Sequence, residues 1–204
     1  MVQASTKLHY YGAHGRAQQI RYTLAAGGIA FEDVCPAGFP PTAEEKANWT
    51  SIGGNTTTNV PMLEMDGKVY TQSTAVLRVA ARKGGLMPTD AEELYQVDKI
   101  IADCEDIRSN GYKAIAMFGA TPEAQENYMK NVLPLHLGNL NRQLGDKAHF
   151  VGDSLTVADT SVFDILFNNA LSMVPDSLND FPNLKKFHDH VAGHDKLKAY
   201  LESE

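Results

Sequence analysis

The chain has 204 residues, enough for one large domain or two small ones. Hydrophobic residues make up 43% and charged residues 21%, an ordinary balance for a protein with a buried core. The net charge of -7, from 18 lysines and arginines against 25 aspartates and glutamates, argues against a surface that covers nucleic-acid phosphates. No apolar run has the length of a signal peptide or a membrane span, so we expect a cytoplasmic protein that binds neither membranes nor nucleic acid.

The cysteine and histidine pattern predicts no metal site. Cys35 and Cys104 are far apart and form no C-x-x-C pair, and the histidines show no ligand spacing. We expect both cysteines to be small buried hydrophobes in a reducing compartment.

Strand and helix signals alternate through residues 1–83. The glycine pair Gly27-Gly28 ends the first helical pattern, and Asp66-Gly67 is typical of a tight hairpin turn. The predicted order is a strand at 8–11, a helix at 17–26, a strand at 29–34, a short helix near 43–48, strands at 60–65 and 68–70, and a helix from 72. We therefore predict an α/β domain of order βαβ-ββα.

Residues 84–89 are the predicted linker, and residues 90–204 carry only helical patterns. Apolar residues from Leu94 to Ile107 recur at helical spacing. Thr121-Pro122 is a helix start, and the leucines from 133 to 144 continue that helix with a kink at Pro134. Thr156 to Asp159 fits a capping box, a folding device without a catalytic role, and Phe181-Pro182 starts another helix. The second domain is predicted to be all-helical.

Five short motifs occur in a fixed order along the chain. They are Lys7-Leu8-His9-Tyr10-Tyr11 with Gly15-Arg16-Ala17; Val60-Pro61-Met62-Leu63-Glu64 with Asp66-Gly67; Gln72-Ser73 with Ala75-Val76-Leu77-Arg78; Glu105-Asp106-Ile107-Arg108; and Phe150-Val151-Gly152-Asp153 with Leu155-Thr156 and Ala158-Asp159. Each motif alone is weak, but together they are specific. Over nearly its whole length the chain resembles the cytosolic glutathione transferases. The tyrosine-type classes (sigma, pi, mu and alpha) are most similar, because a tyrosine ends the first strand. This resemblance implies a thioredoxin-like N-terminal domain, a helical C-terminal domain and a homodimer.

The resemblance makes Tyr10 the catalytic residue, and the chemistry agrees. A free thiol has a pKa of about 8.5, so little of it is thiolate at neutral pH. A tyrosine hydroxyl can donate a hydrogen bond to the sulfur and stabilise the thiolate. As neighbours on one strand, Tyr10 and Tyr11 are expected to point to opposite faces, so only one can reach the sulfur. From spacing alone, Tyr10 could equally be a packed strand residue.

The resemblance also implies how the co-substrate glutathione is held. Gln72-Ser73, at a helix N-terminus, would bind the γ-glutamyl carboxylate, although Ser73 could simply cap the helix. Val60-Pro61 resembles the family's cis-proline turn, whose backbone pairs with the cysteinyl unit. Arg16 matches an arginine beside the site, or forms a structural ion pair. Asp106 would reach the γ-glutamyl ammonium of the partner subunit's glutathione.

The glycyl carboxylate has no clear partner, because relatives place a tryptophan before a lysine whereas here Lys46 precedes Trp49. Either residue, or neither, could serve. The electrophile site is expected to be lined by Tyr11, Ala13, Tyr112 and Ala116. Conjugation of small hydrophobic electrophiles is the function implied. Two alternatives stay open, a glutathione-dependent isomerase such as a prostaglandin D synthase, and a non-catalytic, crystallin-like structural relative.

Overall fold

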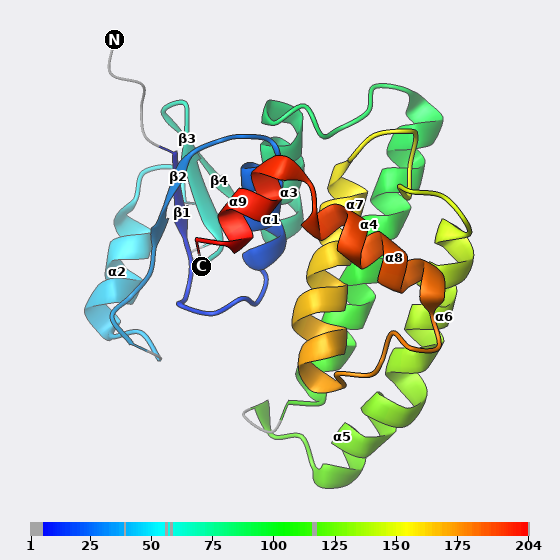
Figure 1. Cartoon of the computed structure of the whole chain (residues 1–204). Coiled ribbons are helices and arrows are strands. Elements are labelled where there is room, and N and C mark those ends of the chain that lie inside the picture. The colour runs from blue at the N-terminus through cyan, green and yellow to red at the C-terminus, as the bar shows by residue number, and fades with distance from the viewer. Residues whose placement is uncertain (1–5, 39, 56, 58, 116–117, 204) are drawn as a thin grey trace. The chain divides into compact units, whose positions relative to one another are not determined.

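The computed structural model describes residues 6–38, 40–55, 57, 59–115 and 118–203. The chain divides into two compact units between Met87 and Pro88 (Figure 1). This division falls inside the segment 84–89.

The first unit is built on a four-stranded mixed sheet. Its strands are β1 (Thr6–His9), β2 (Phe31–Val34), β3 (Met62–Met65) and β4 (Lys68–Thr71), in the spatial order β2-β1-β3-β4. β1 runs parallel to β2 and antiparallel to β3, and β4 pairs antiparallel with β3. The β3–β4 turn is Asp66-Gly67, both with positive φ, as the sequence predicts.

Three helices complete the first unit: α1 (Gln18–Ala26), α2 (Ala43–Ser51) and α3 (Ser73–Lys83). α1 packs against α3, whereas α2 lies on the other side of the strands (Figure 1). The C-terminal ends of α1 and α3 meet at Gly27 and Gly84, where a β-carbon on Gly27 would lie 2.7 Å from the Gly84 Cα. The order is the predicted βαβ-ββα with α2 between its halves, a thioredoxin-like arrangement.

The first strand lies two residues earlier than predicted and ends at His9 instead of Tyr11. The Tyr10 N–H still donates to the Val34 carbonyl, at 3.2 Å, but the chain then turns, and the Ala13 N–H donates to the Tyr11 carbonyl at 2.7 Å. Tyr10 and Tyr11 therefore open a loop and do not alternate across a strand. The expectation that they face opposite sides is wrong, because their ring centroids lie only 5.0 Å apart.

All regular secondary structure in the described part of the second unit is helical. Its α-helices are α4 (Ala91–Lys113), α5 (Pro122–Asn127), α6 (Leu133–Leu144), α7 (Val157–Asp164), α8 (Pro182–Ala192) and α9 (Asp195–Leu201). α4 packs along α7, and α8 packs against both α6 and α7. The side chains between them form a core of leucine, valine, isoleucine and phenylalanine.

Helix starts in the second unit follow the sequence signals. Thr121 accepts the Ala124 N–H, and Asp159 accepts the N–H of Thr156 at 2.7 Å and that of Phe150 at 2.8 Å. The predicted kink lies before Pro134, as a π-helical segment, Tyr128–Val132, between α5 and α6. Proline lacks the N–H that would continue an α-helical ladder, so a local change of hydrogen-bond pattern is expected here.

A buried ion pair accounts for part of the fourth motif. Arg108 is 1% exposed, and its Nη2 lies 2.9 Å from Asp164 Oδ2. Asn168 donates to the other carboxylate oxygen of Asp164 at 2.9 Å. Removing one partner of such a pair would leave the other charge buried and uncompensated, which is strongly destabilising. Arg108 thus has a structural role that ties α4 to α7.

The two cysteines differ in environment, and one expectation is wrong. Cys104 is buried in α4, but Cys35 is exposed, because it follows the last residue of β2 at the end of the sheet.

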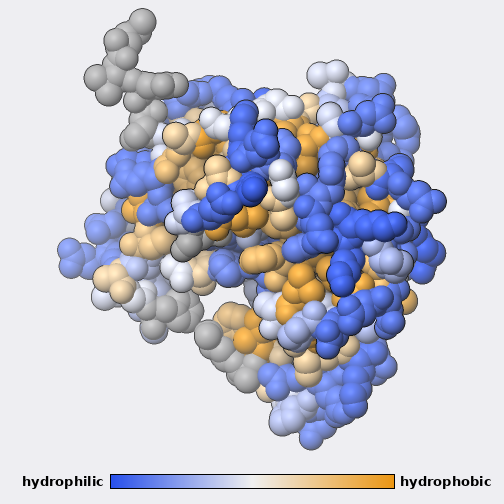
Figure 2. Space-filling model, in the orientation of Figure 1, coloured by the Kyte–Doolittle hydropathy of each residue, from blue (hydrophilic) through white to orange (hydrophobic). Residues whose placement is uncertain are grey.

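Polar residues cover much of the face shown in Figure 2, with apolar residues between them.

Candidate active site

The sheet register brings three sequence motifs to one end of the first unit. His9 in β1 lies opposite Met62 in β3, and Met62 lies opposite Thr71 in β4. The residues that follow β1, precede β3 and follow β4 therefore share this end of the sheet. These residues are Tyr10, Val60-Pro61 and Gln72-Ser73.

Tyr10 is held with its hydroxyl against the start of the next helix. Its side chain is buried, at 8% exposure, and its Oη accepts the backbone N–H of Arg16 at 3.1 Å. Among the described residues no acceptor takes the hydroxyl's own hydrogen. Burial raises the pKa of Tyr10, although the Arg16 hydrogen bond and the charges of Arg16 and Arg21 act in the opposite direction. The phenol therefore stays protonated at neutral pH and can donate.

Tyr11 packs between two other rings. Its centroid lies 5.0 Å from Tyr10 and 5.6 Å from Trp49 of α2, both in edge-to-face geometry. Trp49 is buried, whereas Lys46, one turn earlier in α2, is exposed. Lys46 makes no ion pair with any residue that the structure describes.

The N-terminus of α3 carries the Gln72-Ser73 pair. Gln72 is the residue before the helix, with φ of 70°, and its side chain makes no capping hydrogen bond. Gln72 is exposed and Ser73 half-buried. The neighbouring Val60-Pro61 bond is cis, as expected.

Arg21 is a central residue that the sequence analysis missed. It lies in α1, is 4% exposed, and forms a two-pronged ion pair with Asp33 of β2, at 2.7 Å and 3.2 Å. Its Nη1 donates to the Ala13 carbonyl at 2.9 Å, and its Nη2 to the Tyr11 carbonyl at 3.4 Å. A single charge between the apolar residues of the 17–26 helix was the signal that could have revealed it.

Two predicted site residues belong to α4 in the second unit. Asp106 is exposed, and Tyr112 is half-buried with its ring 5.9 Å from that of Phe118. Ala116 lies outside the described residues. Ala13, in the first unit, is exposed in the loop after Tyr11.

Both parts of the chain match models of known protein families. Residues 6–82 match the model of the glutathione S-transferase N-terminal domain, and residues 105–204 match that of the C-terminal domain. "Glutathione S-transferase 2" of Manduca sexta is 35% identical over 202 residues, covering 96% of this chain and 94% of that protein. The chain belongs to the glutathione S-transferase family.

Further relatives agree with this assignment. "Hematopoietic prostaglandin D synthase" of Gallus gallus is 31% identical over 197 residues, covering 96% of this chain and 94% of that protein. The structure of the pi-class glutathione S-transferase of Onchocerca volvulus superposes with a TM-score of 0.84 at 27% identity, covering 98% of this chain and 93% of that one. The chain is thus a glutathione transferase, of a family that uses glutathione as substrate.

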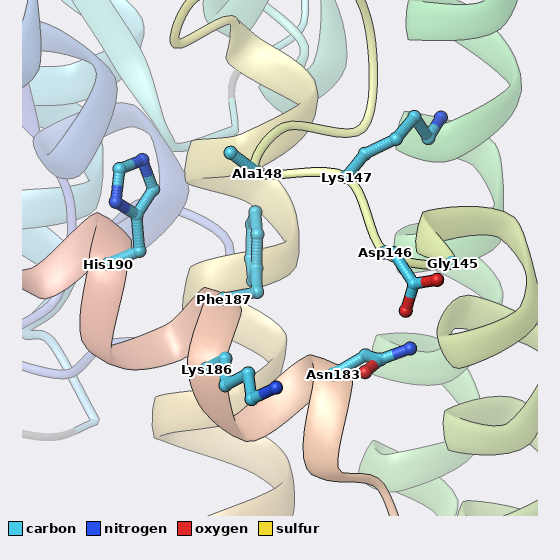
Figure 3. A pocket seen from close by; sticks show the side chains of 8 residues that line it. All are labelled: Gly145, Asp146, Lys147, Ala148, Asn183, Lys186, Phe187 and His190. Atoms are coloured by element: carbon cyan, nitrogen blue, oxygen red, sulfur yellow. The ribbon is translucent and has the colours of Figure 1, made fainter.

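A cavity in the second unit of the transferase differs in character from the Tyr10 site. It has a volume of about 290 Å³ and lies between the loop after α6 and one face of α8 (Figure 3). Phe187 stands between α8 and Ala148, and the Lys147 ammonium is already engaged by the Phe150 carbonyl at 3.0 Å. Its described lining residues include no tyrosine, serine or cysteine. The candidate active site of the transferase is therefore assigned to the first unit. The lining residues are Gly145, Asp146, Lys147, Ala148, Asn183, Lys186, Phe187 and His190.

Within the described ranges, no group of three or more histidine, cysteine, aspartate or glutamate side chains could hold a metal ion. No helix in the same part of the chain is long and apolar enough to cross a membrane.

Proposed function

We propose that this transferase conjugates the thiolate of glutathione to small hydrophobic electrophiles, with Tyr10 as the catalytic residue. The observation that carries the proposal is the Tyr10 hydroxyl, which is fixed by the Arg16 N–H and remains protonated by burial. Accepting that N–H also polarises the phenol, which makes it a stronger donor toward the sulfur.

One hydrogen bond is sufficient for the activation required. A hydrogen bond to a charged acceptor contributes about 1.5–3 kcal/mol, and 1.36 kcal/mol corresponds to one pKa unit. The thiol pKa of about 8.5 would then fall by roughly one to two units, so that the thiolate share at pH 7 rises from a few per cent to between about a quarter and three quarters. The sulfur then attacks the electrophilic carbon, and the leaving group departs with the bonding electrons.

Glutathione would lie along the end of the sheet that carries Tyr10. Gln72 and Ser73 offer an uncapped helix start to the γ-glutamyl carboxylate. The Val60-Pro61 backbone would pair with the cysteinyl unit. Arg16 would contribute positive charge beside the site.

We assign the glycyl carboxylate to Lys46 in preference to Trp49. An exposed ammonium can meet a carboxylate, whereas the buried indole is already packed against Tyr11. Trp49 then supports the wall of the site.

Dimerisation and the electrophile site complete the proposal. Asp106 is useful to glutathione only across a subunit boundary, so we propose a homodimer in which it reaches the partner's ligand. Tyr11, Ala13, Tyr112 and Ala116 would line the electrophile site. Detoxification in the cytoplasm is the physiological role that we propose.

A second candidate is a glutathione-dependent isomerase. It is favoured by the 31% identity to the protein named prostaglandin D synthase, and it would need the same thiolate. The greater identity to the moth glutathione S-transferase favours conjugation. A non-catalytic, crystallin-like role would require that the Tyr10 hydroxyl be idle.

Two assays on the purified chain separate these functions. We expect retention on immobilised glutathione together with turnover of a generic aryl halide. Binding without turnover of the aryl halide, but with isomerisation of a prostaglandin endoperoxide, would favour the isomerase. Binding without either reaction would favour the structural role. An active monomer at assay concentration, seen by sedimentation, would contradict the role given to Asp106.

A further inference from the structure

Arg21 connects three parts of the first unit that meet around Tyr10. Its Nε and Nη2 bind the carboxylate of Asp33, which fixes the guanidinium relative to β2. The remaining N–H groups face the loop between β1 and α1. A planar guanidinium can make these contacts at once because its five donors have a fixed geometry.

The loop contacts of Arg21 lie on the residues directly after Tyr10. Nη1 donates to the carbonyl of Ala13 and to Gln18 Oε1, both at 2.9 Å, and Nη2 reaches the carbonyl of Tyr11 at 3.4 Å. The backbone on both sides of Gly12 is thus held from within α1. Without Arg21, these two carbonyls would have to accept hydrogen bonds from other donors, such as solvent.

Arg21 also lies over Tyr10 itself. The guanidinium carbon is 5.9 Å from the centroid of the Tyr10 ring, within the range of a cation–π contact. The charged and titratable groups that act on the phenol are Arg16, Tyr11 and Arg21. The Arg16 N–H holds the hydroxyl end of Tyr10, and Arg21 holds the ring and the following backbone.

We propose that Arg21 is a positioning residue for the reaction, which holds the Tyr10–Ala13 segment so that the phenol hydroxyl stays directed at the glutathione sulfur. This inference rests on the proposed role of Tyr10. Arg21 does not touch the sulfur, and its effect on the reaction passes through Tyr10. A loop released from Arg21 would let the hydroxyl move, and a small displacement of a catalytic group lowers the rate strongly.

The test is a titration of the thiol of bound glutathione, followed by the ultraviolet absorbance of the thiolate, beside kcat and KM. In Arg21→Gln the pKa of the bound thiol should rise toward its free value, and kcat should fall by roughly ten- to a hundredfold, while KM for glutathione changes much less. Arg21→Lys keeps the positive charge but lacks the planar guanidinium that makes several contacts at once. It should fold, and the pKa of its bound thiol should lie between those of the wild type and Arg21→Gln.

Two further variants test whether an effect on the titration comes from positioning or from a simple loss of stability. Asp33→Asn weakens the ion pair that fixes the guanidinium, so it should lower the unfolding midpoint and shift the bound-thiol titration by less than Arg21→Gln does. Thr23→Val removes a buried hydroxyl that bonds to the Gln19 carbonyl within α1. It should lower the unfolding midpoint but leave the titration unchanged.

These measurements distinguish failure of the positioning role of Arg21 from failure of the proposed role of Tyr10. If Tyr10→Phe shifts the thiol titration but folded Arg21→Gln and Arg21→Lys do not, Arg21 is only structural and the positioning role is wrong. The same conclusion follows if Thr23→Val shifts the titration as much as Arg21→Lys. If Tyr10→Phe itself has no effect, both the tyrosine mechanism and the positioning role fail.

Discussion

The hydroxyl of Tyr10 occupies the space that a side chain on Gly15 would need. A β-carbon built on Gly15 would lie 2.5 Å from Tyr10 Oη, closer than such atoms can approach. Gly15 also has φ of +43°, a conformation that favours glycine. The position of the Tyr10 hydroxyl therefore depends on Gly15. Because Gly15 has no side chain, there is room for the hydroxyl beside the Arg16 N–H.

Gly15→Ala should displace the Tyr10 hydroxyl and lower kcat by about tenfold or more. It should also cost about 1 kcal/mol of stability because of the positive φ. Gly85→Ala is the matched control, since Gly85 has φ of +71° but no atom within 4 Å of its built β-carbon. Kinetics with glutathione and an aryl halide, beside denaturant unfolding, check both. Equal activity of the two variants would show that Gly15 does not set the Tyr10 position.

Ser73→Ala and Gln72→Ala should raise KM for glutathione far more than KM for the electrophile. Each removes a contact to a charged group worth about 1.5–3 kcal/mol, which corresponds to roughly ten- to a hundredfold in affinity. Thr74→Ala, at the next position of α3, serves as the control. Calorimetric titration with glutathione measures the affinities. Unchanged affinity for glutathione in both variants would show that Gln72 and Ser73 begin the helix but do not bind glutathione.

The His149–Asp159 contact should make stability depend on pH. His149 Nδ1 lies 3.6 Å from Asp159 Oδ2, and Asp159 raises the pKa of His149 above its usual 6.5 in the folded state. Because the folded pKa is the higher one, the stabilisation is fully present below about pH 6.5 and is lost as pH rises through the folded pKa. The contribution should stay below about 1 kcal/mol.

His149→Gln should therefore lose more stability at pH 5.5 than at pH 9. Urea unfolding of wild type and variant at both pH values measures the difference. When Asp159 is already replaced by Asn, the further change His149→Gln should alter the stability by the same amount at both pH values. A His149→Gln loss that is larger at pH 9 would contradict the assigned direction of the pKa shift.

The sequence predicted the fold well because its signals are local. The Asp66-Gly67 turn and the Thr121 and Thr156 helix starts depend on neighbouring residues, and each occurs as expected. The predicted end of β1 was wrong because strand-forming residues continue to Tyr11, whereas pairing with β2 and β3 ends at His9. Strand pairing is tertiary, and a single run of strand formers does not reveal it.

The site was accessible to sequence reasoning only in part. Tyr10 stood out through a motif, but Arg21 in the next helix lies over its ring, and Arg21 is itself fixed by Asp33 in the next strand. Their partners are set by how α1 packs on the sheet, which residue spacing does not encode. Trp49 is a comparable case, since its burial against Tyr11 depends on where α2 lies.

The central claim is that the Tyr10 hydroxyl stabilises the thiolate. Tyr10→Phe should lower turnover by roughly ten- to a hundredfold at pH 7, from the loss of about 1.5–3 kcal/mol. The loss should shrink above the pKa of the free thiol, where solvent performs the deprotonation. Tyr11→Phe keeps the ring contacts to Tyr10 and Trp49, so its turnover should stay near that of the wild type.

The most direct measurement is the pH–rate profile of wild type, Tyr10→Phe and Tyr11→Phe with glutathione and an aryl halide. The account predicts that only Tyr10→Phe shifts the profile, toward the pKa of free glutathione. A normal profile for Tyr10→Phe beside a strongly impaired Tyr11→Phe would mean that the wrong tyrosine has been chosen. Normal profiles for both variants would contradict the tyrosine mechanism altogether.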